Sequence, residues 1–264
     1  MVVQCRQKDV STVFDYIGSD IGRCLYLYMD LLEFGCESDG VSVWRECGAD
    51  GGMAAVGLIY GRTCHLFSRT DTVDATAWKT LCQKRDIRLI CGASQIVSQM
   101  QTVVSGVAEF GWVGHAVRMG NVDEGEDGIR PARREDFRAI AHLLYEHAHY
   151  SRKSDCETVQ RELVTRWERG FTRHNVLVKN GQIVAHVGTT AECPHFAVVG
   201  GAVVDPMCRG QGIGVRLLRL TCAQVQAEGK EAYSFYYDDG TRRFNYAAGL
   251  LMHCTWGRMF LNEE

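Results

Sequence analysis

The sequence predicts a mixed α/β fold, with a mainly antiparallel central sheet flanked by helices, and three observations support this prediction. Residues 129–264 alternate between segments of strand periodicity and segments of helix periodicity. An apolar strand at residues 196–204 runs into a glycine-rich turn that opens an amphipathic helix. An acidic stretch at residues 121–128 separates this order from a fainter version of it in residues 1–120, which predicts two domains in tandem.

The N-terminal domain, residues 1–120, shows apolar segments of alternating strand and helix character. They predict a helix at 26–34, strands at 41–46, 53–60 and 63–68, a helix at 76–85, a strand at 87–91, a helix at 94–104 and a strand at 111–119. This order repeats part of the order in the C-terminal domain, so we expect an internal duplication at the level of the fold.

The boundary between the domains is predicted at residues 121–128, whose sequence is Asn-Val-Asp-Glu-Gly-Glu-Asp-Gly. Small, acidic and turn-forming residues cannot bury enough apolar surface to order such a segment. It is therefore interpreted as a linker, and the C-terminal domain is expected to span residues 129–264.

The C-terminal domain is predicted to have the order β-α-α-β-β-β-α-β-α-β. Its elements are a strand at 129–132, helices at 134–150 and 155–169, strands at 175–179, 183–191 and 196–204, a helix at 213–228, a strand at 232–237, a helix at 241–251 and a strand at 254–261. The Asn180-Gly181 pair suits a tight hairpin between the second and third strands.

Composition narrows the possible environment and partners of the chain. The net charge is −3, although residues 1–127 hold 11 basic against 17 acidic side chains and residues 128–264 hold 18 against 15. The C-terminal half is thus the better host for an anionic ligand, and neither a nucleic acid nor a membrane surface is expected as a partner. No segment looks like a transmembrane span or a secretory signal, and the twelve cysteines form no CxxC pair, so we expect a cytoplasmic protein with free thiols and no metal site.

The segment from Val203 to Leu218 carries the chemical signal. The strand ends near Pro206, three glycines then alternate over five residues, and a helix begins. Glycines let the main chain approach an oxygen-rich ligand, and the first turn of a helix offers unpaired N–H groups with a partial positive charge. Such a turn binds a pyrophosphate. A Walker loop would need Gly-Lys-Ser/Thr and a dinucleotide fingerprint would need GxGxxG, and this GxGxG spacing fits neither.

The turn instead matches the R/Q-x-x-G-x-G/A signature of the GNAT superfamily of acetyltransferases, after the V-x-P turn that usually precedes it. The chain therefore resembles a GNAT acetyltransferase over about residues 128–264. The resemblance implies the GNAT fold and binding of acetyl-CoA as co-substrate, with Val203 and Val204 offering backbone groups to the pantetheine and the thioester carbonyl. The implied pyrophosphate contacts are Arg209, Gly210, Gln211, Gly212, Ile213 and Gly214.

The resemblance also implies direct transfer of an acetyl group to an amine of a small molecule or peptide, without an acyl-enzyme. Candidates for the general base or acid are Glu192 and His195, which flank the start of the central strand, and His186 on the strand before it. Many relatives place a tyrosine four residues ahead of a Gly-Phe pair, but here that register holds Asn245, with Tyr246 one step later. Tyr246 is the candidate acid, and Asn245 could bind the cofactor.

Residues 1–120 contain no R-x-x-G-x-G segment and look similar to the degenerate N-terminal half of two-domain bacterial GNAT proteins. By that analogy this half shapes the acceptor pocket or a homodimer. Two alternatives remain open: a non-catalytic acyl-CoA sensor, which the displaced tyrosine favours, and a tRNA-dependent aminoacyl transferase, which the net charge of −3 disfavours.

Overall fold

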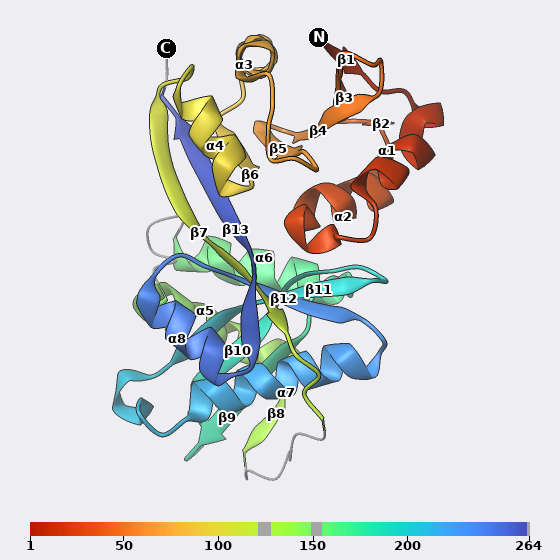
Figure 1. Cartoon of the computed structure of the whole chain (residues 1–264). Helices are drawn as coiled ribbons and strands as arrows, with labels where there is room; N and C mark the ends of the chain where they lie inside the picture. Colours follow the sequence, from red (N-terminus) through yellow and green to blue (C-terminus); the bar gives the residue numbers. More distant parts are fainter. Residues whose placement is uncertain (121–127, 149–154, 263–264) are drawn as a thin grey trace. The chain divides into compact units, whose positions relative to one another are not determined.

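The computed structural model of the chain describes residues 1–120, 128–148 and 155–262 (Figure 1). Its internal contacts divide the chain into two compact units. Unit 1 consists of Met1–Val113 with Met252–Glu264, and unit 2 of Gly114–Leu251. Most of the predicted linker, residues 121–127, lies outside the described residues.

Unit 1 is a mixed sheet covered by four helices. Its strands follow the order β1-β3-β4-β5-β6-β13-β7, with β2 beside β3. The strands are β1 (Val2–Gln4), β2 (Glu37–Ser38), β3 (Val41–Cys47), β4 (Met53–Tyr60), β5 (Thr63–Phe67), β6 (Leu89–Gly92), β7 (Gly106–Ala116) and β13 (Leu250–Leu261), of which β7 and β13 continue into unit 2. The helices are α1 (Val10–Ile17), α2 (Leu25–Phe34), α3 (Ala75–Lys84) and α4 (Ser94–Gln101).

Unit 2 is a second mixed sheet with helices on both faces. Its strands follow the order β12-β11-β10-β9-β8, and β7 neighbours β12. The strands are β8 (Ile129–Pro131), β9 (His174–Lys179), β10 (Gln182–Glu192), β11 (Phe196–Val204) and β12 (Glu231–Tyr236), and the helices are α5 (Phe137–His147), α6 (Cys156–Glu168), α7 (Ile213–Ala227) and α8 (Asp239–Ala247).

Alternation along the strands of unit 2 separates its two apolar cores. Leu177 and Ala185 pack with α7 on one face of the sheet. Val176 and Val203 pack with α5 on the other face. Because neighbouring residues of a strand point to opposite faces, the predicted mixed α/β fold with a sheet between two helical layers is confirmed.

The two units repeat one another in strand order and sense. In unit 1, β3, β4 and β5 are antiparallel neighbours, and β5 then pairs with β6 in parallel after the crossover helix α3. In unit 2, β9, β10 and β11 do the same, and β11 pairs with β12 in parallel after α7. The strands β1 of unit 1 and β8 of unit 2 are each followed by the same short helical turn, in which an aspartate accepts the backbone N–H of an arginine three residues earlier. The pairs are Arg6 with Asp9 and Arg133 with Asp136.

The units differ from the sequence-based boundaries, because two strands are exchanged. Residues 257–260 of β13 pair with β6 of unit 1, although the predicted boundary placed this strand in the C-terminal domain. The end of β7, from the N-terminal half of the sequence, lies next to β12 in unit 2. Strand exchange depends on pairings between residues far apart in the sequence, which local patterns do not reveal.

Neither a membrane span nor a metal cluster is found in the described part of the chain. None of its helices combines the length and the apolar character that crossing a bilayer requires. The same residues contain no group of three or more His, Cys, Asp or Glu placed to hold a metal ion.

Candidate functional site

The glycine-rich turn lies between β11 and α7 of unit 2. After β11 ends at Val204, a short 3-10 turn at Pro206–Cys208 leads to Gly210 and Gly212. Both glycines have left-handed backbones, with φ of 78° and 74°, which other residues adopt at a cost. A Cβ atom at either position would meet no atom within 4 Å, so the space in front of the turn is open.

The third glycine of the motif has a different role. A Cβ atom at Gly214 would lie 3.1 Å from the Phe244 ring and 3.2 Å from the Val204 side chain. Glycine here therefore lets the first turn of α7 pack closely against α8 and the end of β11.

The N-terminus of α7 is available to an anion. No side chain caps it among the described residues, and its first residue follows Gly212. By contrast, the aspartates Asp155 and Asp238 cap α6 and α8, each accepting a backbone N–H at 2.8 Å. The unpaired N–H groups of the first turn, together with the helix dipole, make this end of α7 a site for phosphate oxygens.

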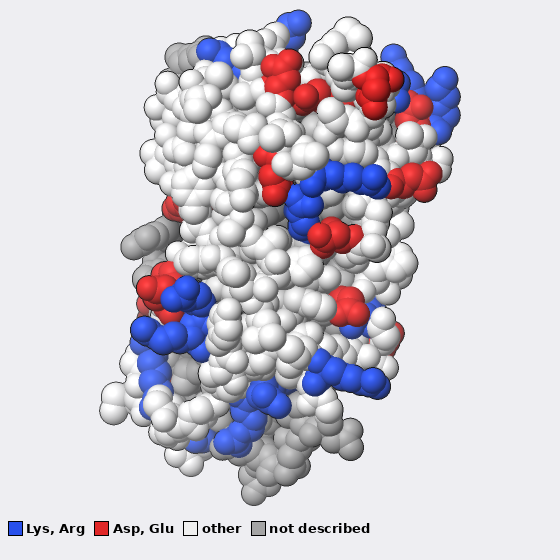
Figure 2. Space-filling model, in the orientation of Figure 1, with Lys and Arg blue, Asp and Glu red and all other residues white. Residues whose placement is uncertain are grey.

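Basic side chains surround the turn. Arg209 is anchored by its Nε, which donates to the carbonyl of Val204 at 3.0 Å, and Lys179 donates to the Gln211 side chain at 3.3 Å. On the face drawn in Figure 2, Lys and Arg side chains lie over α7 and α8 of unit 2. The local charge therefore suits a ligand with several negative charges.

A gap between strands leads away from the turn. β11 pairs with β12 only from Phe196 to Val198, although β11 continues to Val204 and β12 to Tyr236. Beyond Val198 the backbone of β11 has no partner strand on that side among residues 1–120, 128–148 and 155–262, and backbone N–H and C=O groups in that position require other partners. An extended amide-containing chain, such as pantetheine, can supply them.

Asn245 on α8 is a buried side chain with an unused acceptor. Its Nδ2 donates to the carbonyl of Thr241 at 2.8 Å, while its Oδ1 has no hydrogen-bond partner among the described residues. Leaving such an acceptor unpaired costs about 1–3 kcal/mol, and an amide N–H of a ligand would relieve that cost. The neighbouring Tyr246 is 46% exposed, so its hydroxyl-bearing ring is accessible on the same helix.

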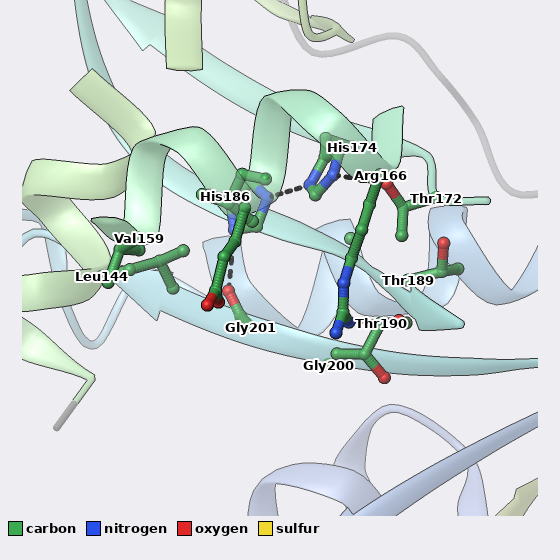
Figure 3. Close-up of a pocket in the computed structure, with 13 residues that line it drawn as sticks. Leu144, Val159, Arg166, Thr172, His174, His186, Thr189, Thr190, Gly200 and Gly201 are labelled. Carbon is green, nitrogen blue, oxygen red and sulfur yellow. Dashed lines mark hydrogen bonds between the residues drawn. The ribbon is translucent and has the colours of Figure 1, made fainter. Parts of the chain in front are cut away.

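A small cavity of about 80 Å³ lies on the α5/α6 face of the unit 2 sheet (Figure 3). It borders an irregular part of β11. Gly200 and Val203 of β11 pair with Gly188 and His186 of β10, so two residues of β11, Gly201 and Ala202, lie opposite the single residue Val187. Gly201 has a φ of 62°, as expected for a bulge of this kind. The lining includes Gly200 and Gly201 of β11, Thr189 and Thr190 of β10, and Glu162 and Arg166 of α6.

One wall of the cavity is a chain of buried polar groups. His186 Nδ1 lies 2.8 Å from the Gly201 carbonyl oxygen, His186 Nε2 lies 2.9 Å from His174 Nδ1, and His174 Nε2 lies 3.0 Å from the Thr172 hydroxyl. Burial lowers the pKa of His186 to about 4, and burial together with the neighbouring His186 lowers the pKa of His174 to about 3. Both imidazoles are therefore neutral at physiological pH.

Glu162 is the acidic group of the cavity. It is an exposed carboxylate on α6 and forms no ion pair with the other described residues. Arg166, one helical turn later, donates to the carbonyl of Thr190 at 3.1 Å. Neither residue was predicted as a site residue, because the only signal in the sequence is their spacing of four on an amphipathic helix.

Of the three candidate bases, His186 lines the cavity, and the other two lie elsewhere. Glu192 accepts two hydrogen bonds from Arg173 at 2.7 Å and one from Lys230 at 3.1 Å. Burial raises its pKa, but the hydrogen bonds from Arg173 and Thr189 outweigh burial and lower the pKa overall, which makes Glu192 a weak base. His195 is exposed in the turn before β11, about 25–30 Å along that strand from the glycine turn. Neither residue lines the cavity.

The equivalent position in unit 1 is closed to anions. The crossover helix α3 carries its own cap, because Asp74 Oδ1 accepts the backbone N–H of Ala77 at 3.0 Å. Glu46 accepts the backbone N–H of Asp74 at 3.0 Å and the indole N–H of Trp78 at 2.7 Å. Two carboxylates thus occupy the place where unit 2 presents unpaired N–H groups.

Comparison with known proteins also points to unit 2 as the unit that carries the site. Residues 134–248 match the model of the acetyltransferase (GNAT) family. A search of curated protein sequences finds no match. Among solved structures, a GCN5-related N-acetyltransferase from Sphaerobacter thermophilus has a TM-score of 0.65 at 16% identity, covering 98% of this chain and 94% of its own.

Two further solved structures cover both units. An acetyltransferase of the GNAT family from Colwellia psychrerythraea has a TM-score of 0.61 at 9% identity, covering 99% of this chain and 100% of its own. A tandem GNAT protein from the clavulanic acid biosynthesis pathway has a TM-score of 0.53 at 14% identity, covering 100% and 99%. At these identities the structures establish the fold alone, whereas the family model covers the glycine turn and its helix. Residues 134–248 of this chain are therefore similar to the GNAT acetyltransferase family, and the fold of the chain is that of solved GNAT proteins.

Proposed function

We propose that the chain is an N-acetyltransferase that moves an acetyl group directly from acetyl-CoA to an amine of a small molecule or peptide. The observation that carries the proposal is the N-terminus of α7, which no side chain of the described part of the chain caps and which faces open space behind the left-handed Gly210 and Gly212. A multiply charged phosphate ligand is what such a helix end binds best.

The chain's residues fit the separate parts of acetyl-CoA. The backbone N–H groups from Gln211 to Gly214, with Arg209, would hold the pyrophosphate. The backbone of β11 at Val203 and Val204, on the side that faces away from β10, would with Asn245 hold the amides of the pantetheine arm. When bound, acetyl-CoA supplies an acetyl group already activated as a thioester.

The cavity beside Gly200 and Gly201 is the proposed acceptor site. Glu162 would hold the ammonium form of the acceptor by a charge-assisted hydrogen bond and take its proton, directly or through one water. A backbone N–H at the bulge would stabilise negative charge that develops on the acetyl oxygen. Tyr246, on the helix that carries Asn245, is the proposed donor of a proton to the leaving thiolate.

The test combines binding with turnover. Calorimetry with acetyl-CoA measures binding, and thiol release from acetyl-CoA is followed with a panel of amino acids, polyamines, aminoglycosides and peptides with free N-termini. At least one amine should be acetylated. Binding of acetyl-CoA without turnover of any amine would contradict the enzyme proposal and favour an acyl-CoA sensor.

Glu162→Gln provides the residue-level test, with Glu157→Gln as the matched control. Both glutamates are exposed on α6, but only Glu162 lines the cavity. Loss of a general base reduces kcat by about 10²-fold or more, so Glu162→Gln should lose this rate while it binds acetyl-CoA normally. Equal rates for the two variants would remove Glu162 from the mechanism.

A further inference from the structure

The hydrogen-bonded chain of Thr172, His174 and His186 has a defined direction (Figure 3). A carbonyl oxygen only accepts hydrogen bonds, so His186 must carry its proton on Nδ1 to donate to Gly201. Neutral His186 then has a lone pair on Nε2, so His174 must donate from its own Nδ1. The Nε2 of His174 is left as an acceptor, and it accepts a hydrogen bond from the Thr172 hydroxyl.

Two glycines provide the space that the imidazole rings occupy. A Cβ atom at Gly188 would lie 2.5 Å from His174 Nδ1, and a Cβ atom at Gly201 would lie 3.3 Å from His186 Cε1. Phe137 of α5 packs edge-on against the His174 ring, with centroids 5.2 Å apart and an interplanar angle of 85°. The rings are thus held by packing as well as by hydrogen bonds.

The chain ends on the peptide that forms the bulge. A trans peptide is planar, and its N–H points opposite to its C=O. Because His186 holds the carbonyl of Gly201, the N–H of the same peptide, which belongs to Ala202, points away from His186. Ala202 is exposed although it lies in a central strand. It lies beyond Val198, the last residue at which β11 pairs with β12.

We propose that Thr172, His174 and His186 are positioning residues that fix the Gly201–Ala202 peptide, so that the Ala202 N–H is the donor for the acetyl oxygen. This inference rests on the proposed acetyl transfer. The histidines exchange no proton with the acceptor amine. The charged residues of the cavity lining are Glu162 and Arg166. Both come from α6, which lies across the cavity from the sheet that carries the histidines.

A matched pair of variants at one position separates positioning from packing. In His186→Asn the amide nitrogen replaces Nδ1 and can still donate to Gly201, whereas in His186→Gln the amide reaches the place of Nε2 instead. Removing a preorganised oxyanion donor costs about 10²–10³ in kcat, so a misdirected donor in His186→Gln should cost about 10- to 100-fold more kcat than His186→Asn. The affinity for CoA, measured by calorimetry, should be unchanged in both variants.

A second readout does not depend on activity. Long-range ¹H–¹⁵N spectra report which imidazole nitrogen carries the proton, and both His174 and His186 of the wild-type protein should be protonated on Nδ1. Protonation of His186 on Nε2 would overturn the inference, as would equal kcat values for His186→Asn and His186→Gln. If the wild-type protein acetylates no amine, the proposed function falls and this inference with it. Protonation of His186 on Nε2, or equal kcat values for the two variants, would overturn this inference and leave the proposed function standing.

Discussion

Gly212→Asp is predicted to abolish binding of acetyl-CoA without unfolding the protein. The position has room for a side chain, because a Cβ atom there meets nothing within 4 Å. Aspartate and asparagine tolerate left-handed backbones better than other residues, which otherwise lose about 1–2 kcal/mol there. A new side-chain cap on α7 contributes about 1 kcal/mol, so the free energy of unfolding should change little.

The loss of affinity follows from charge. An aspartate at the N-cap of α7 would place a carboxylate where the pyrophosphate should bind, as Asp74 does at α3. Two unit charges about 5 Å apart repel by about 3 kcal/mol at an effective dielectric of 20. The dissociation constant should therefore rise at least about 100-fold, which calorimetry with CoA measures directly.

Gly212→Asn is the matched control for this prediction. Asparagine has the same shape and can cap the helix, but it carries no charge. It should weaken CoA binding much less than aspartate, and added salt should reduce the difference between the two variants. Equal affinities for the two variants would refute the electrostatic reasoning, and wild-type affinity in both would refute the site itself.

Three other predictions follow from named contacts. Asp74→Ala should lower the free energy of unfolding by about 1 kcal/mol through loss of the α3 cap, while leaving CoA affinity unchanged in calorimetry; weakened CoA binding would contradict the closed site in unit 1. In the folded protein His174 and His186 have pKa values of about 3 and 4, so they stay neutral below pH 6.5, whereas the same histidines become protonated in the unfolded chain. The free energy of unfolding from denaturant titrations should therefore fall by about 2 kcal/mol per histidine between pH 6.5 and pH 5, and a flat profile would contradict their burial as neutral groups. Tyr246→Phe should lower kcat about 10-fold or more without changing CoA affinity, and an unchanged kcat would remove it as the acid.

Local signals predicted the elements that position the cofactor site. The strand predicted at residues 196–204 and the helix predicted at 213–228 match β11 (Phe196–Val204) and α7 (Ile213–Ala227). Their ends are marked by Pro206 and by glycines at positive φ, which act through the local backbone alone. The same locality explains why the hairpin at Asn180 was predicted correctly.

One helix end, one short helix and one strand pairing were not predicted from the sequence. The helix predicted to reach residue 251 ends at Ala247, and β13 begins at Leu250, because Gly249 turns the chain with a φ of 87°. The short helix α1 (Val10–Ile17) was missed. Pairing of β13 with β6 joins residues more than 160 positions apart, and no local period encodes it.

The cavity was hidden from the sequence for the same reason. Glu162, His174 and His186 come from a helix and two strands, and only the register of β9 against β10 brings the two imidazoles together. Of the candidates taken from the sequence, His186 does line the cavity, whereas Glu192 and His195 were chosen for their nearness to the start of β11. The bulge at Gly201 lies farther along that strand.

The proposed function depends on binding of the acetyl-CoA pyrophosphate by the first turn of α7. An amide-resolved NMR titration of the whole chain with CoA tests it most directly. The largest shifts, and slower hydrogen exchange, are expected at the backbone amides from Gly210 to Val215. Unchanged amides there, or shifts confined to the start of α3 near Asp74, would contradict it.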